Sequence, residues 1–163
     1  MTNFQKVQEF NELFGAIRHN TPNKDILDNN KLIKFRMDLI REEMKELEEA
    51  VQNKDYVETV DALSDILYVV YGMGDAIGVN LDDAFKLVHE SNMSKLCDTE
   101  KQAIETVEWY KEQFKLGLQP YDTPNYRSRI IGNKEYFVVY NESTSKILKS
   151  IYYQPVDLKK LCD

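Results

Sequence analysis

The sequence predicts a mainly helical fold, a four-to-five-helix bundle with a small β-hairpin appended at its C-terminal end. Over roughly the first hundred residues, apolar side chains recur at three- and four-residue intervals, the period of a helix with one buried face. Beyond Pro120 and Pro124 the pattern changes to short runs of β-branched and aromatic residues, which favour strands. We expect residues 1–117 to form the helical domain and residues 118–163 to form an extension packed on the same domain.

Two helices and a loop are expected in the N-terminal third of the chain. The first helix covers residues 3–17, where one apolar stripe consists of Phe4, Val7, Phe10, Phe14 and Ile17. Residues 18–30 are rich in turn-forming types and predict a loop. A second amphipathic helix follows over residues 31–52.

The third predicted helix, from Asp55 to about Gly78, is apolar nearly all round. Asp55 is suited to N-capping, and glycine is a typical C-terminal stop. A helix of this composition is buried by neighbouring helices or by a second subunit. We therefore expect a homo-oligomer, a dimer or a dimer of dimers, because four helices alone hardly cover it.

The rest of the chain predicts two shorter helices and a small sheet. The helices cover residues 82–93 and 99–115. The dipeptide Gly132-Asn133 is a turn signal, and the run at 136–140 together with the segment from Lys146 predicts a hairpin or a three-stranded appendage.

Composition excludes several classes of function. The formal charge of −7 opposes binding to a long phosphate backbone, which depends on clustered Lys and Arg. Neither a disulfide framework nor a zinc site is expected, because the candidate ligands are isolated in sequence: Cys97, Cys162, His19 and His89. No apolar run reaches the roughly 18 residues of a membrane span, and the N-terminus lacks the features of a secretory signal. We expect a soluble, cytoplasmic protein that binds neither polymeric nucleic acid nor membrane.

Five carboxylates on the second and third predicted helices form the candidate site. Glu42, Glu43 and Glu46 share one face of the second helix. Asp61 and Asp65 are one turn apart on the third. If the two helices are antiparallel and joined by a short turn, both sets lie at similar distances from it and face each other.

Such a cluster favours a hard divalent cation. Neighbouring carboxylates repel one another unless cations neutralise them, and oxygen ligands favour Mg²⁺, or Mn²⁺ in its place. Phosphate oxygens complete the shell of a carboxylate-bound Mg²⁺, and a bound metal activates water for hydrolysis. Two other interpretations stay open: the acids are a solvated helix face, or the aspartates pair with a cation from Lys34, Arg36 or Lys95.

Three segments resemble one family of enzymes. They are Glu42-Glu43-x-x-Glu46, Asp-Ala-Leu-Ser-Asp-Ile-Leu-Tyr-Val-Val-Tyr-Gly at 61–72, and Val-His-Glu-Ser-Asn-Met-Ser-Lys at 88–95. In order and spacing they resemble the MazG-like, all-α nucleoside triphosphate pyrophosphohydrolases. Within these, they are most similar to the phosphoribosyl-ATP pyrophosphohydrolase-like (Cof-like) branch, which includes dimeric dUTPase-like enzymes. The resemblance implies magnesium-dependent, house-cleaning cleavage of a (d)NTP, such as dUTP, dCTP or a modified nucleotide, to monophosphate and pyrophosphate through water attack at the α-phosphorus.

The resemblance also implies roles for individual residues. The implied catalytic residues, which are also metal ligands, are Glu42, Glu43, Glu46 and Asp65. The family usually has a Glu three residues before the final Asp, whereas here Ala62 takes that place and the acid is Asp61. Four residues is still one helical turn, so we keep Asp61 as a metal ligand.

Three further residues are expected at the substrate. The resemblance implies phosphate contacts for Asn92 and Lys95, whose competing interpretation is a surface residue or a helix cap. Tyr68, three residues after Asp65, is expected near the same face, either at the nucleotide or as a core aromatic.

Two alternative functions stay open. A phosphoribosyl-ATP pyrophosphohydrolase keeps the fold and changes the substrate. A non-catalytic helical interaction module has merely solvated acids, and it predicts no metal dependence and tolerance of Asp65→Asn.

Overall fold

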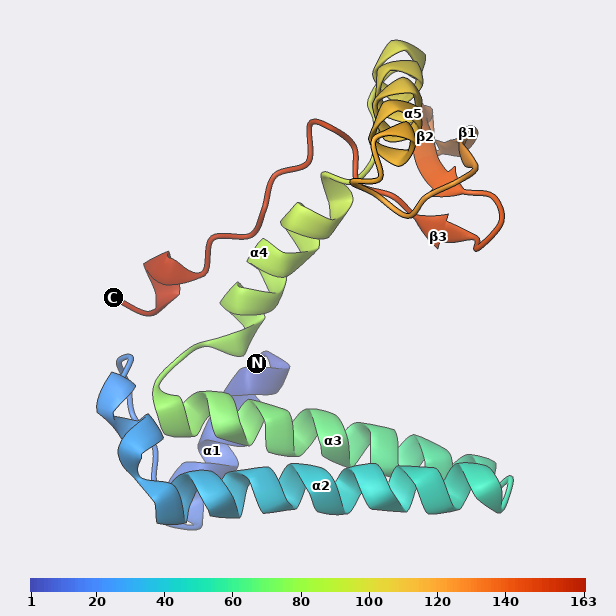
Figure 1. The fold of residues 1–163 in the computed structure, drawn as a ribbon. Coiled ribbons are helices and arrows are strands. Elements are labelled where there is room, and N and C mark those ends of the chain that lie inside the picture. Colours follow the sequence, from blue (N-terminus) through green and yellow to red (C-terminus); the bar gives the residue numbers. More distant parts are fainter. The chain divides into compact units, whose positions relative to one another are not determined.

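The computed structural model describes residues 1–163. It contains five α-helices and one three-stranded antiparallel sheet, which confirms the predicted mainly helical fold class (Figure 1). Contacts divide the chain into two compact units: the first comprises Met1–Lys86 and Leu158–Asp163, and the second comprises Leu87–Asp157. This division falls earlier than the predicted boundary at residue 117, because the fifth helix packs on the sheet and belongs with it.

The first unit is built on an antiparallel helix pair, α2 (Asn30–Gln52) and α3 (Tyr56–Ile77), which lie side by side (Figure 1). The predicted capping of α3 is confirmed. The side chain of Asp55 accepts hydrogen bonds from two first-turn amides, and Gly78 ends the helix in the left-handed conformation, with φ of 78°. The turn between the helices is only three residues long, so positions equally far from it face each other.

The helix α1 (Asn3–Leu13) packs on α3, but it is shorter than predicted. We expected it to continue to Ile17, and it ends at Leu13 because Gly15 turns the chain with φ of 69°. Of the predicted stripe, Phe4 and Val7 are buried. The other three members are exposed by 42%, 73% and 52%: Phe10, Phe14 and Ile17.

The predicted loop at 18–30 is confirmed, and it contains a short 3-10 helix, η1 (Lys24–Asp28). The loop is tied to the end of α3 by backbone hydrogen bonds from His19 to Asp75 and from Asn23 to Ile77. At Gly78 the approach is close enough that an added Cβ would lie 1.9 Å from the carbonyl oxygen of Thr21.

Within one chain, α3 is not buried all round. Four of its apolar side chains are between 47% and 72% exposed: Val57, Val60, Leu63 and Leu67. Of the two expected ways of burying this helix, neighbouring helices of the same chain do not suffice on this side, because α1 and α2 cover only part of the circumference. Burial by a second subunit stays a prediction.

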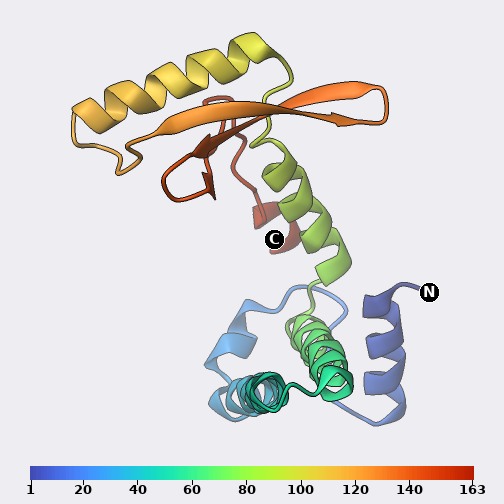
Figure 2. The same cartoon turned by 90° about the vertical axis from the view of Figure 1, so that its right-hand side faces the viewer.

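The second unit combines a helix with a sheet. The helix α4 (Leu81–Met93) begins in the first unit and ends in the second, and α5 (Glu100–Lys115) lies close to its predicted range. The strands β1 (Pro124–Ile131), β2 (Lys134–Asn141) and β3 (Lys146–Ile147) follow in sheet order, with Gly132-Asn133 as the turn between the first two. Figure 2 shows α5 lying along one face of the β1–β2 hairpin. The core between them consists of Cys97, Ala103, Val107, Tyr110, Phe137, Val139 and Leu148.

Membrane-span criteria are met by no single helix, and only the strongly bent pair of α3 and α4, taken together, reaches the required length and composition.

Candidate functional site

The five predicted carboxylates lie on the facing helices α2 and α3. None of their side chains forms an ion pair or a hydrogen bond with another residue; they are Glu42, Glu43, Glu46, Asp61 and Asp65. The lysines considered as structural counterions are engaged elsewhere: Lys34 pairs with Asp38, and Lys95 donates to Asn92. Positive charge from the protein therefore does not neutralise this cluster at contact distance.

Glu43 lies at the centre of the cluster. Its pKa is raised above 4.5, first by burial and then by repulsion from four other carboxylates: Glu46, Asp65, Glu42 and Asp61. Because two of these belong to α3, the α2 and α3 acids are close enough to influence one another. The antiparallel arrangement expected from the sequence thus brings both sets together.

The five carboxylates suit a hard cation, although their side chains are not arranged as the ligands of one ion. No three Asp, Glu, His or Cys side chains in the structure converge as the ligands of one ion do. All five candidate donors are carboxylates, which is the chemistry that Mg²⁺ prefers, and the exposed acids are free to reorient. The residues present therefore fit a divalent cation by type and charge.

Tyr68 lies near the carboxylates in sequence and against α1 in space. Its ring meets that of Phe10 edge-on, with centroids 5.6 Å apart. It also lines a cavity of about 250 Å³ between α1 and α3, beside Lys6, Ser64 and Tyr71. Tyr68 is 39% exposed, so it is not a fully buried core aromatic.

Asn92 and Lys95 lie in the second unit, at the end of α4. The Lys95 ammonium donates a hydrogen bond of 2.6 Å to the Asn92 side-chain oxygen. Both residues also take part in the local backbone turn, where the Lys95 amide donates to the Asn92 carbonyl. Their predicted contact with phosphate stays a prediction.

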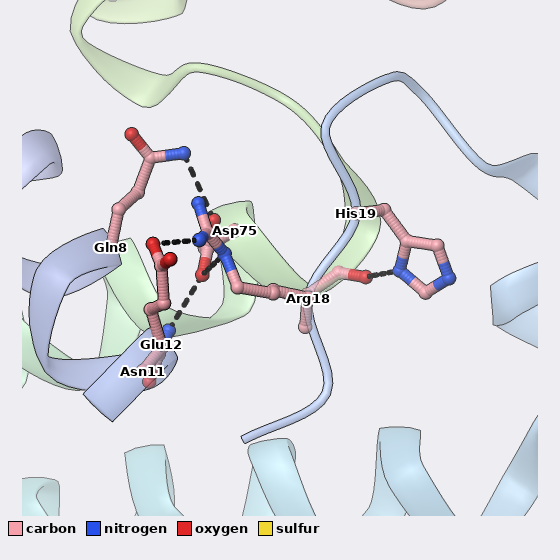
Figure 3. A network of polar contacts seen from close by, with 7 residues as sticks. Gln8, Asn11, Glu12, Arg18, His19 and Asp75 are labelled. Carbon is pink, nitrogen blue, oxygen red and sulfur yellow. Dashed lines mark hydrogen bonds and ion pairs between the residues drawn. The ribbon is translucent and has the colours of Figure 1, made fainter. Parts of the chain in front are cut away.

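A buried polar network that was not predicted from the sequence surrounds Asp75 of α3 (Figure 3). Asp75 has no exposed surface, and its carboxylate accepts hydrogen bonds from Gln8 at 3.1 Å and Asn11 at 2.8 Å. Arg18 approaches it at 3.5 Å and also pairs with Glu12 at 2.7 Å. This network fixes α1 and the following loop on α3. Its sequence signal is a single Asp within an otherwise apolar run.

Arg36 is the second residue whose importance the sequence did not show. It is only 6% exposed, on the face of α2 that meets α3, and burial lowers its pKa while Asp75 opposes that shift. It stands seven residues before Glu43, which places both on one helix face. A charged residue on the inward stripe of α2 was the available signal.

Comparison with known proteins shows the family of the chain. Residues 7–92, just over half of the chain, match the family described as phosphoribosyl-ATP pyrophosphohydrolase. The chain belongs to this family. The match contains the second part of α1, all of α2 and α3 and nearly all of α4, and with them the five carboxylates and Asn92. Membership in the phosphoribosyl-ATP pyrophosphohydrolase family indicates a pyrophosphohydrolase, a hydrolase that acts on acid anhydrides.

The chain is also similar to an uncharacterized protein of Acanthamoeba polyphaga mimivirus. The two are 29% identical, and the alignment covers 94% of this chain and 92% of the relative. Alignment of that extent continues beyond residue 92, where the family match ends.

Proposed function

We propose that the protein is a magnesium-dependent nucleoside triphosphate pyrophosphohydrolase that converts a (d)NTP to the monophosphate and pyrophosphate. Candidate substrates are dUTP, dCTP or a modified nucleotide. The observation that carries the proposal is the set of four carboxylates that raise the pKa of Glu43 across the α2–α3 pair. Family membership supports the release of pyrophosphate.

The carboxylates would hold the metal. Glu42, Glu43, Glu46, Asp61 and Asp65 supply only oxygen donors, and no protein cation competes for them at contact distance. When bound, Mg²⁺ offsets the charge of the triphosphate and makes a coordinated water more acidic. The negative cluster would repel a triphosphate without such cations, so we expect hydrolysis to cease in EDTA.

The reaction itself is a displacement at the α-phosphorus. A water oxygen forms the new bond to that phosphorus, the bond from it to the α–β bridging oxygen breaks, and pyrophosphate leaves with the electron pair. The water proton is transferred to a carboxylate of the cluster or to solvent. Glu43 is suited to this role, because its neighbours make it a better proton acceptor than an isolated glutamate.

The test is a product assay with purified protein. Each canonical NTP and dNTP is incubated with Mg²⁺ or with EDTA, and pyrophosphate and orthophosphate are measured separately. We expect metal-dependent pyrophosphate release that Glu43→Ala and Asp65→Ala both abolish. Glu48→Ala is the matched control, since Glu48 is an exposed acid on the same helix. If no nucleotide is cleaved and the variants fold like the wild type, the acids are a solvated face and the non-catalytic interpretation replaces this proposal.

A second candidate substrate is phosphoribosyl-ATP, which the description of the matching family favours. The bond broken is the same, because this compound carries a triphosphate whose α–β linkage releases pyrophosphate. The same assay distinguishes the two: a kcat/KM for phosphoribosyl-ATP well above that for every (d)NTP would assign the protein to that reaction.

We also propose that the protein works as a homo-oligomer, a dimer or a dimer of dimers. The support is the exposed apolar surface of the helix pair, to which α2 contributes Met44 at 43% exposure and Val51 at 57%. Apolar patches of this kind on a helix pair usually mark an interface. Light scattering coupled to size exclusion at micromolar concentration tests the proposal, and a monomer would overturn it.

A further inference from the structure

Arg36 is a buried cation without a hydrogen-bond acceptor from the protein. Its guanidinium forms no hydrogen bond or ion pair with protein atoms, and its Nε is enclosed without a partner. Leaving a guanidinium N–H enclosed in a protein interior without an acceptor is unfavourable. Buried unsatisfied groups are uncommon in native proteins and call for a specific explanation, such as a ligand.

Asp75, the nearest counterion, does not satisfy these donors. It interacts with Arg36 through charge, without a hydrogen bond. Its oxygens already accept hydrogen bonds from Gln8 and Asn11, and Nε of Arg18 lies 3.5 Å from one of them in an ion pair (Figure 3). Asp75 therefore offsets part of the charge of Arg36. The hydrogen-bonding requirement of the guanidinium is left to another acceptor.

A cavity of about 370 Å³ lies beside this arginine, between the start of α2 and the segment that follows α1. Arg36 and Lys31 supply its two cations, and no acidic side chain lines it. The other walls are mainly apolar and include Ile17, Leu32 and Phe35, of which Phe35 is 55% exposed. The volume is within the range of about 300–1,000 Å³ that is typical of small-molecule sites.

The neighbouring helix makes room for the guanidinium. A Cβ at position 72 would lie 2.8 Å from Nη1 of Arg36, so only glycine leaves the observed position open. Arg36 stands two helical turns before Glu43, about 10 Å along the axis of α2. The cavity and the carboxylate cluster are therefore separate positions on the same helix.

We propose that this cavity binds a nucleoside monophosphate, with the guanidinium of Arg36 donating to the phosphate and the base lying against Phe35. Arg suits this ligand because its planar fork matches phosphate oxygens in a bidentate contact, and Lys31 adds a second charge at the rim. The apolar walls suit a planar ring rather than a free phosphate ion. The choice of a nucleoside as the organic part rests on the proposed function, whereas the anion site rests on Arg36 and the cavity alone.

Calorimetric titration of the full chain in EDTA tests the inference, since without metal the carboxylate cluster repels anions. The probes are dAMP and dTMP, with the corresponding nucleosides and inorganic phosphate as comparisons. We expect at least one monophosphate to bind at least tenfold more tightly than its nucleoside and than phosphate. Arg36→Met should weaken that binding at least tenfold, and Arg41→Met, which removes an exposed arginine of the same helix, should leave it unchanged.

Gly72→Ala is a second variant, which tests the role of Arg36 in case Arg36→Met does not fold. It displaces the end of the flexible Arg36 side chain while keeping its charge, and it should also weaken binding, with an unchanged circular dichroism spectrum. The inference is wrong if neither monophosphate binds in EDTA, if nucleoside or phosphate binds equally well, or if Gly72→Ala binds like the wild type. Glu43→Ala should abolish pyrophosphate release and still bind the monophosphate in EDTA. A failure of the proposed hydrolysis is therefore distinguishable from a failure of the proposed monophosphate site.

Discussion

Replacing Asp75 by alanine should strongly destabilise the first unit. Asp75 has no exposed surface, and its carboxylate accepts hydrogen bonds from Gln8 and Asn11. It also forms an ion pair with Arg18 and attracts the positive charge of Arg36. Asp75→Ala leaves the side-chain amides of Gln8 and Asn11 without their acceptor and the buried guanidinium of Arg36 without its counterion, whereas Arg18 keeps its ion pair with Glu12.

The expected loss of stability follows from the charge that is left buried. Removing one partner of a buried ion pair costs about 3–5 kcal/mol, because the remaining charge is left uncompensated. The total stability of a natural domain is only about 5–15 kcal/mol, so the variant should be close to unfolding. Asp75→Asn keeps one acceptor oxygen and should lose less.

Urea unfolding followed by far-ultraviolet circular dichroism measures the effect. We expect a much lower midpoint for Asp75→Ala with an unchanged slope, a smaller shift for Asp75→Asn, and no shift beyond about 0.5 kcal/mol for the exposed control Glu48→Ala. A loss below about 1 kcal/mol for Asp75→Ala would mean that water readily replaces the carboxylate, and the argument from an uncompensated buried charge would fail.

Three further predictions concern the carboxylate cluster and the loop contact. Because folding raises the pKa of Glu43, the ionised form of this side chain destabilises the metal-free protein. Glu43→Gln should therefore raise the free energy of unfolding by about 0.5 kcal/mol at pH 7. That gain in stability should be absent below pH 4.5, the ordinary pKa of a glutamate, because the side chain is then protonated in the folded and the unfolded protein. Thermal unfolding in EDTA tests this, and an equal gain at pH 7 and below pH 4.5 would contradict it. Mg²⁺ at ten times its dissociation constant should stabilise the wild type by about 1.4 kcal/mol and Asp65→Ala much less, as a thermal shift assay would show. Gly78→Ala should cost at least about 1–2 kcal/mol in urea unfolding, because its φ is 78° and the new Cβ meets the Thr21 carbonyl; a stability equal to wild type would exclude this contact.

The helices of the first unit were predictable where local chemistry determines them. Asp55 caps the third helix through its side chain, and Gly78 ends it in a conformation that glycine adopts without strain. The end of the first helix was missed because the apolar stripe continues past it. The helix ends at Leu13 and Gly15 turns the chain, so Phe14 and Ile17 stay exposed.

Other features depend on tertiary contacts that periodicity does not encode. An apolar residue on α3 has the same pattern whether α2, α1 or another subunit covers it, so the exposure of Leu63 and Leu67 could not be predicted. The grouping of the carboxylates was predictable, because a three-residue turn fixes the pairing of α2 with α3. The burial of Arg36 was not, because it depends on Gly72, whose lack of a side chain opens the space for it.

The division of the chain into two units affects how the C-terminal segment is held in place. Residues 158–163 return to the first unit, where Lys24 and Asp163 pair at 3.0 Å, so residues 87–157 form an inserted module. If that module unfolded, 71 flexible residues would have to close on themselves, at an entropic cost of about 4 kcal/mol. The exposed ion pair between Lys24 and Asp163 contributes only about 0–1 kcal/mol toward this cost. Docking of the C-terminal segment therefore reports whether the inserted module is folded, and a spectroscopic label near Asp163 would detect its unfolding from within the first unit.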